Sequence, residues 1–397
     1  MMSLLITTTL ICIVLIIYHH LGYPVLLWGI SKWLSIKESK KSKKTKSPFL
    51  LKNKASYPSV AVVIPAYNEA HYIAEKIRNL AMLDYPKDRL RVILGCDGCT
   101  DKTALIARKT IAEWGCSHLN IEIKEFHHNR GKVAVLNDIM ANVDEDLVAL
   151  SDVSALISID ALQVAKIHFN DPTIGLVTGH YQLFNPGSNG EEAYWEYQCS
   201  VKEQEAQLGS VIGAHGAFYM IRRNLYIPLP DNSINDDFII AMSIVRQGYH
   251  AIYSSSINAI ELEQASGEVD YHRRSRIAAG NLQQLIWFKE LMSPRYRGVA
   301  FTFASGKGLR VLMPFLLIGA WIGSILLVET GLFFLLAAVG QSLAYIAALL
   351  FQLIHPRKTY RVWQTIHYLV SGYVANLIGC VNYIFRRDSD HWPHFKH

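Results

Sequence analysis

Residues 59–70, SVAVVIPAYNEA, decide the fold class of this chain. The β-branched run at 60–64 ends at Pro65 and is followed by polar residues, which is typical of a strand buried in a parallel sheet. A helix is expected over about 70–82, because apolar residues at 73, 77 and 80 fall on one of its faces.

The same plan repeats downstream. Residues 90–115 give a strand, a turn at Asp97 and Gly98, and a helix; a strand at 121–128, a helix at 133–143 and a strand at 146–150 follow. Alternation of this kind predicts an α/β fold with a mostly parallel sheet flanked by helices, whose ligand site lies at the carboxyl ends of the strands. The polar clusters fall at such ends.

Apolar segments enclose this domain. The chain has 397 residues, of which 51% are hydrophobic. Residues 3–30, 311–328, 331–354 and about 364–385 are long and apolar enough to span a bilayer. If all of them cross, the tail lies outside, whereas Arg386 and Arg387 favour the inside, so the number of spans stays open. We divide the chain into 1–30 (span), 31–56 (linker), 57–270 (α/β domain), 271–310 (interfacial helices), 311–385 (spans) and 386–397 (tail).

A lysine-rich linker follows the first span. Its nine lysines lie at 32, 37, 40, 41, 43, 44, 46, 52 and 54. Such a flank stays cytoplasmic and attracts anionic headgroups, so we expect an integral protein of a bacterial inner membrane with a cytosolic catalytic domain. Nucleic-acid binding is a poor interpretation, because the cluster abuts a span and has little aromatic interleaving.

Seven segments carry a resemblance to a known family. In chain order they are VVIPAYNE, CDGCTDKT, NRGKVAVLN, SDVS, GAHGAFYMIRR, NDDF and RRSRIAAGN. Together they resemble membrane-bound family 2 inverting glycosyltransferases of the GT-A fold, related to cellulose and hyaluronan synthases. The match covers 60–285 and extends to spans at both ends.

The resemblance implies a nucleotide-sugar donor site. It assigns Pro65, Tyr67, Glu69 and Asp97 to the nucleoside and places Lys132 near the diphosphate. Lys132 also begins a helix, where a cation opposes the helix dipole and calls for compensation by an anion. Arg273 and Arg276 are the further donor-binding candidates, because guanidinium groups bind phosphate oxygens bidentately.

Asp152 and Ser154 are the candidate metal ligands. The family pattern is Asp-x-Asp, and Ser154 replaces the second acid. Mg²⁺ or Mn²⁺ needs only one or two carboxylates when diphosphate oxygens and water complete its shell, so Asp152 can serve with weak help from Ser154.

Two acids precede the helix that starts near residue 238. The resemblance makes Asp237 the base that takes the acceptor proton, with Asp236 in support. Adjacent carboxylates repel, which raises one pKa and improves that base. Trp195, His215 and Gly216 are the acceptor-side candidates. Ile277 stands where processive relatives have a tryptophan, which puts polymerisation in doubt.

The sequence therefore predicts a membrane glycosyltransferase that uses a nucleotide-linked sugar, expected to be UDP-linked, with inversion. The acceptor is a growing polysaccharide or a lipid-linked saccharide, and export or polysaccharide-assembly proteins are conceivable partners. Two alternatives stay open, a transporter or channel and a nucleotide-binding scaffold without turnover.

Overall fold

The computed structural model describes residues 1–42, 57–187, 189–263, 267–354 and 361–385. The chain divides into two compact units. We call residues 30–187 and 192–264 the sheet unit, and residues 1–29, 188–191 and 265–397 the helical unit. The domain boundaries predicted from the sequence, 57 and 270, stay a prediction.

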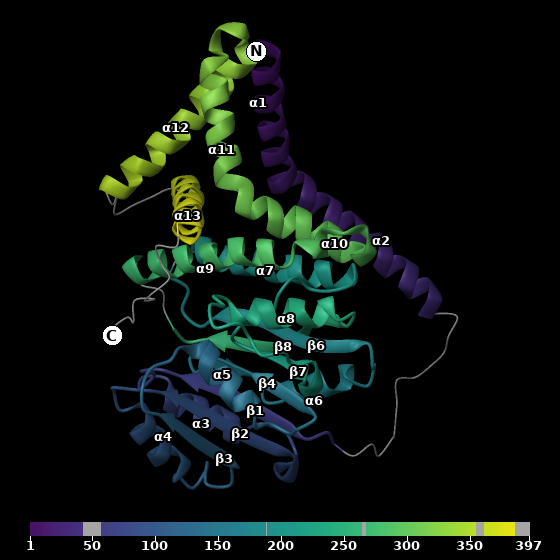
Figure 1. Ribbon diagram of the computed structural model, residues 1–397, viewed down its shortest axis with the longest axis vertical. Coiled ribbons are helices and arrows are strands. Elements are labelled where there is room, and N and C mark those ends of the chain that lie inside the picture. Colours follow the sequence, from purple (N-terminus) through teal and green to yellow (C-terminus); the bar gives the residue numbers. More distant parts are fainter. Residues whose placement is uncertain (43–56, 188, 264–266, 355–360, 386–397) are drawn as a thin grey trace. The chain divides into compact units, whose positions relative to one another are not determined.

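The described part of the sheet unit contains eight strands in the order β3-β2-β1-β4-β7-β6-β8-β5, and Figure 1 labels all of them except β5. They are β1 (Val60–Ala66), β2 (Leu90–Asp97), β3 (Ile121–Phe126), β4 (Leu147–Leu150), β5 (Ala155–Ile157), β6 (Ile174–Leu183), β7 (Tyr219–Arg222) and β8 (His250–Glu261). The helices are α3 (Ile73–Ala81), α4 (Thr103–Ile111), α5 (Lys132–Met140), α6 (Ala161–His168), α7 (Asn189–Gln207) and α8 (Asp236–Arg246).

The sheet is mixed rather than mostly parallel. Strands β1, β2, β3 and β4 pair in parallel, as predicted, and so do β6 and β8. However, β7 runs antiparallel to both β4 and β6, and β5 runs antiparallel to β8. These two strands have only four and three residues, too few for their direction to be visible in the sequence pattern.

Strand β1 is buried on both faces, which explains its unbroken apolar run. Val60, Val62 and Ile64 join one core cluster with the apolar stripe of α3. On neighbouring β2, a Cβ at Gly95 would come within 2.7 Å of side chains of Val135 and Ile139 on α5. The missing side chain of Gly95 thus lets α5 pack closely, and this fixes where α5 begins.

The described part of the helical unit consists of helices and π-helical turns. They are α1 (Met2–Ile17), a π-helical turn η1 (Tyr18–Gly22), the first part of α2 (Tyr23–Ser42), α9 (Gly267–Trp287), α10 (Gly298–Thr302), a second π-helical turn η6 (Phe303–Gly308), α11 (Leu309–Leu326), α12 (Leu332–Ile354) and α13 (Arg361–Ile384). Among the described residues, three helices are long and apolar enough to cross a membrane: Met2–Lys37, Gly298–Leu326 and Leu332–Ile354.

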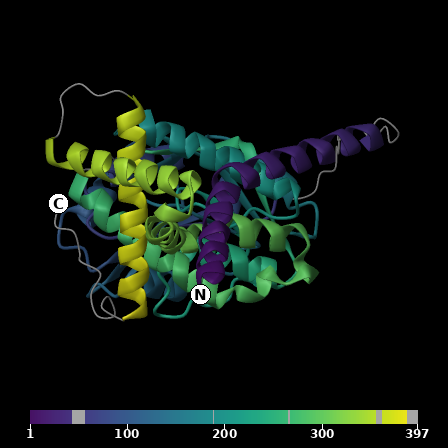
Figure 2. The ribbon, with the colours of Figure 1, turned by 90° about the horizontal axis from the view of Figure 1, so that it is seen from above.

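Helix α13 differs from the span predicted at 364–385. Over the described ranges it is not among the helices of sufficient apolarity. It lies crosswise to α11: Figure 1 shows α13 end-on and α11 lengthwise, and Figure 2 shows the reverse. A Cβ at Gly379 would meet the Ser275 carbonyl oxygen of α9 at 2.4 Å, so the two helices pack very closely. The open question of whether one segment is interfacial therefore centres on α13.

Candidate active site

The site is built around Asp152, directly after β4. Its amide N–H donates to the Gly216 carbonyl oxygen at 3.0 Å, which ties the end of β4 to the loop before β7. A Cβ at Gly216 would lie 2.3 Å from Asp152 Oδ2. The missing side chain of Gly216 therefore leaves room for the carboxylate, and the acceptor role of Gly216 stays a prediction.

Lys132 connects Asp152 to the acids of α8. It is the first residue of α5, and its Nζ lies 2.8 Å from Asp152 Oδ1 and 3.2 Å from Asp236 Oδ2. Burial lowers the pKa of Lys132, but the charges of Asp152 and Asp236 outweigh it and raise that pKa above its usual value. Burial likewise opposes ionisation of Asp152, and Lys132 overrides it to hold the pKa of Asp152 below its usual range. Lys132 and Asp152 are therefore both charged.

Asp236 and Asp237 occupy the first turn of α8, where the helix dipole favours negative charge. Burial and the neighbouring Asp236 raise the pKa of Asp237 to about 6. Asp236 Oδ2 is buried and has no hydrogen bond, although Lys132 Nζ approaches it. The Lys132 ammonium group contacts two of these carboxylates and feels the charge of the third, Asp237, so an excess of negative charge remains for a cation or a proton to balance.

A lysine that sequence reasoning missed, Lys76, holds the segment that carries Asp152. Lys76 of α3 is fully buried, and its Nζ donates to Ser151 Oγ at 2.6 Å and to the Ala155 carbonyl oxygen at 2.5 Å. These contacts fix the chain on both sides of Asp152. Burial lowers the pKa of Lys76 to about 7. In the sequence, the only sign that Lys76 is buried was its position next to Ile77, on the apolar stripe of α3.

Glu69 reaches the same centre from the end of β1. Burial, followed by the charges of Glu263 and Asp152, raises its pKa to about 8. The backbone N–H of Glu69 is held by Thr103 Oγ1 at 2.8 Å. Asn68, at a positive φ of 55°, accepts the Thr100 N–H at 2.9 Å, so the loops after β1 and β2 are joined.

Asp97 lies at the end of β2, as predicted, and is buried. Its Oδ2 accepts the Gly131 N–H at 2.8 Å, and its two oxygens also accept the Arg130 N–H. Gly131, with φ of 87°, directly precedes Lys132. Asp97 therefore shapes the loop that presents Lys132, a contact that the sequence did not reveal, and its nucleoside role stays a prediction.

An aromatic group flanks the carboxylates. His215 stacks on Tyr181 with ring centroids 3.8 Å apart, and Trp195 of α7 packs against both rings at 4.6 and 5.2 Å. His215 also interacts electrostatically with Asp152. Trp195, His215 and Tyr181 thus form one aromatic group, of which His215 is near Asp152, and the acceptor role of Trp195 and His215 stays a prediction.

The described donor set fits a weakly held divalent ion rather than a protein cage. Within the described residues, no three His, Cys, Asp or Glu side chains are grouped for a metal. Asp152 and the hydrogen-bond-free Asp236 Oδ2 present hard oxygen ligands, which suit Mg²⁺ or Mn²⁺ when a diphosphate completes the shell. Ser154 is buried directly after this turn, and its ligand role stays a prediction.

The remaining predicted residues lie at the edges of the site or in the other unit. Pro65 is within β1 and Tyr67 directly follows it, both half-buried. Arg273 and Arg276 belong to α9 of the helical unit, and Arg276 is exposed. Their donor role stays a prediction.

Comparison with known proteins identifies the family. The model of the family described as "Glycosyltransferase like family 2" matches residues 58–279, more than half of the chain. The chain belongs to this family. The matched range contains every residue of the site in the sheet unit.

Two curated relatives of this glycosyltransferase chain come from bacteria. The probable glycosyltransferase YdaM of Bacillus subtilis is 24% identical over 59% of this chain and 58% of its own length. The β-monoglucosyldiacylglycerol synthase of Synechocystis is 23% identical over 69% of this chain and 59% of its own length. The chain thus spans somewhat under two thirds of these relatives.

A solved structure confirms the fold. The mannosyltransferase PcManGT from Pyrobaculum calidifontis, in complex with GDP-Man and Mn²⁺, superposes with a TM-score of 0.70 at 24% identity. The match covers 96% of this chain and 99% of the other. The chain has the GT-A-like α/β fold, and the predicted fold class is confirmed.

Proposed function

We propose that this chain transfers a sugar from a nucleotide donor, UDP-linked, to a hydroxyl acceptor with inversion at the anomeric carbon. The observation that carries the proposal is the group of Asp237, Asp236, Lys132 and Asp152 at the edge of the sheet. A half-buried acid with a pKa of about 6 is ionised at neutral pH and still basic enough to accept a proton.

The chemistry follows from these contacts. Asp237 takes the proton of the acceptor hydroxyl, whose oxygen attacks the anomeric carbon on the face opposite the diphosphate. The bond from the anomeric carbon to the diphosphate oxygen breaks, and the nucleoside diphosphate leaves with that electron pair. Lys132, now shared between two carboxylates, faces the developing phosphate charge and stabilises it. A divalent ion held by Asp152 would add positive charge at the leaving group.

The acceptor is a lipid-linked or polymeric saccharide. The name of the Synechocystis relative, a monoglucosyldiacylglycerol synthase, supports a lipid acceptor for this chain. The three apolar helices support the same acceptor, because they keep the enzyme where such a lipid is found. The Mn²⁺ and GDP-Man of the Pyrobaculum structure support a metal-assisted nucleotide-sugar reaction.

The test is release of nucleoside diphosphate by the full chain in bilayer discs, with a panel of UDP-sugars and GDP-mannose and with a membrane lipid extract as acceptor. We expect release with a UDP-sugar, loss of release in EDTA, and loss in Asp237→Asn. Asp231→Asn, an exposed acid in the loop before α8, is the matched control. Donor binding without release by the unmodified chain would identify a scaffold, and release undiminished in Asp237→Asn would overturn the mechanism.

A further inference from the structure

The helical unit contains a polar cluster where its two π-helical turns meet. Tyr18 Oη and Ser305 Oγ are 2.9 Å apart, and His19 Nδ1 lies 3.2 Å from the Ser305 carbonyl oxygen. Because a carbonyl only accepts, the Nδ1 of His19 is the nitrogen that carries the hydrogen. From α13, Tyr373 Oη lies 2.9 Å from His20 Nε2.

Cationic side chains lie at the same level. Arg310, on the first turn of α11, is within electrostatic reach of both histidine rings. Its backbone oxygen accepts a hydrogen bond from Asn376 of α13 at 2.8 Å, so α11 and α13 are joined there. Lys307, in the second π-helical turn, donates to Asn281 of α9 at 2.7 Å. Four chain segments thus bring hydroxyl groups, imidazoles and cations together.

The position of this cluster along the helices places it at a membrane interface. Helix α1 has 16 residues before Tyr18, about 24 Å at about 1.5 Å per residue, which is most of a hydrocarbon core. Arg310 stands at the start of the apolar part of α11. π-helical turns are rare in proteins, and those that occur are often found at functional sites. Here two of them are joined by a hydrogen bond.

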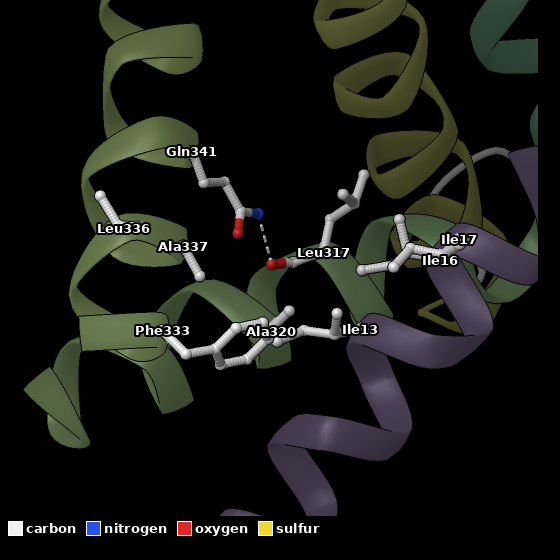
Figure 3. Close-up of a pocket in the computed structure, with 9 residues that line it drawn as sticks. All are labelled: Ile13, Ile16, Ile17, Leu317, Ala320, Phe333, Leu336, Ala337 and Gln341. Atoms are coloured by element: carbon white, nitrogen blue, oxygen red, sulfur yellow. Dashed lines mark hydrogen bonds between the residues drawn. The ribbon is translucent and has the colours of Figure 1, made fainter. Parts of the chain in front are cut away.

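An apolar groove runs along the same helices next to the cluster (Figure 3). Its volume is about 350 Å³, and it is lined from α1, α11 and α12. Ile16 and Ile17 line it and directly precede Tyr18. In Figure 3, Phe333 and Ala337 of α12 face Ile13 and Ala320 across the groove. The groove lies within the three candidate spans, where hydrocarbon chains are the surrounding solvent.

We propose that the groove and the cluster together form a binding site for a lipid that carries a phosphate monoester. The hydrocarbon chain lies in the groove, and the phosphate is held by Arg310 with the hydroxyl groups of Tyr18 and Ser305. Arginine binds phosphate oxygens bidentately, and basic pockets between membrane helices hold anionic headgroups. The site lies within the helical unit and does not depend on the proposed sugar transfer.

Two lipids share this chemistry, a phosphatidic acid of the bilayer and a polyprenyl monophosphate that carries saccharides. Native mass spectrometry of the full chain in neutral detergent tests each of them against phosphatidylcholine of matched chain length. We expect one molecule of a phosphate monoester lipid to be retained in preference to phosphatidylcholine. Preference for the polyprenyl lipid identifies an acceptor site, and preference for phosphatidic acid identifies a bilayer-lipid site; either supports the proposal.

Variants locate the binding. Arg310→Gln should reduce retention of the phosphate lipid by about fivefold to tenfold, the value of one interfacial cation. Arg295→Gln, which removes a charge from a side chain stacked on Tyr296, is the matched control. Ala337→Phe should fill the groove and abolish the preference for long chains over short ones, whereas Leu343→Phe on the exposed surface of α12 should not.

Three results would overturn the proposal. They are equal retention of phosphatidylcholine by the unmodified chain, equal losses in Arg310→Gln and Arg295→Gln, and an unchanged chain-length preference in Ala337→Phe. Size-exclusion elution of each variant checks its folding. Because none of these measurements needs turnover, they remain informative even if the chain transfers no sugar.

Discussion

At the scale of single residues, Asp237 is the group whose titration should set the activity profile. Its pKa of about 6 is raised by burial and by Asp236, so it is protonated and unable to act as a base in more acidic solution. We expect kcat to fall as pH drops through about 6, and Asp237→Asn to lower kcat by about 10²–10⁴-fold with little change in donor KM. Steady-state kinetics between pH 5 and 8 measures both effects. If Asp236→Asn left the pH at which kcat falls unchanged, the assignment of this titration to Asp237 would be contradicted.

Glu69 should hold a proton near neutrality. Its pKa is about 8 in the folded chain, against an ordinary value of 4.5, because burial and the charges of Glu263 and Asp152 disfavour its ionised form. The folded state therefore keeps a proton that the unfolded state releases, and the contribution of Glu69 to stability is full below 4.5 and is lost as pH rises through about 8.

The variant that tests this prediction is Glu69→Gln, because its side-chain amide does not titrate and resembles the protonated acid at every pH. Between pH 6 and 8, where Asp237 has already lost its proton, the unmodified chain should lose stability and Glu69→Gln should lose less. Thermal unfolding in bilayer discs at several pH values provides the comparison. Parallel stability curves for the two proteins would show that Glu69 is ionised in the folded chain.

Sequence reasoning found residues whose chemistry is local and missed those whose role depends on packing. Asp152 and Lys132 could be predicted because each stands at the end of a strand or the start of a helix. Nothing local marks Lys76 as fully buried, since its acceptors lie at 151 and 155 in another element. The contact of Asp97 with the Gly131 N–H likewise arises only when two loops meet.

At the scale of elements, the loop before β7 should be intolerant of a single methyl group. A Cβ at Gly216 would lie 2.3 Å from Asp152 Oδ2, so the carboxylate or the loop must move. A displacement of about 1 Å at a reacting centre can cost about 10²-fold in rate, so we expect Gly216→Ala to lower activity by about tenfold to a hundredfold.

Gly115→Ala is the matched control for this prediction. Gly115 is exposed and a Cβ there meets no atom within 4 Å, so its substitution should leave activity unchanged. The ratio of kcat/KM for the two variants is the measurement. Full activity of Gly216→Ala with normal EDTA sensitivity would show that the close approach to Asp152 is not needed for the reaction.

Elements followed from the sequence where periodicity was long and not where it was short. The first four strands and the helices between them were predictable. Strands β1, β2 and β4 are buried apolar runs, β3 begins with alternating apolar and charged residues, and α3 has an apolar stripe. Strands β5 and β7 have too few residues to show a pattern, and their antiparallel pairing is set by where the chain returns to the sheet. The π-helical turns η1 and η6 are joined by the hydrogen bond between Tyr18 and Ser305, and no sequence periodicity predicts them.

At the scale of the whole molecule, we predict a topology with three spans, which would remove the conflict over the tail. With the lysine-rich segment after the first span in the cytosol, α1 runs inward, α11 outward and α12 inward again. Helix α13 then remains on the cytosolic side, consistent with its crosswise position and its packing on α9. The predicted topology also agrees with the positive-inside rule for Arg386 and Arg387, which lie outside the described residues.

This topology predicts opposite accessibility for two exposed positions, Glu329 between α11 and α12 and Ile384 at the end of α13. In a variant whose six native cysteines are replaced, Glu329→Cys should react with a membrane-impermeant maleimide added to intact cells. Ile384→Cys should react only after the membrane is opened. If α13 crossed the bilayer as a fourth span, both cysteines would be labelled from outside, because an even number of crossings returns the chain to the side of its N-terminus.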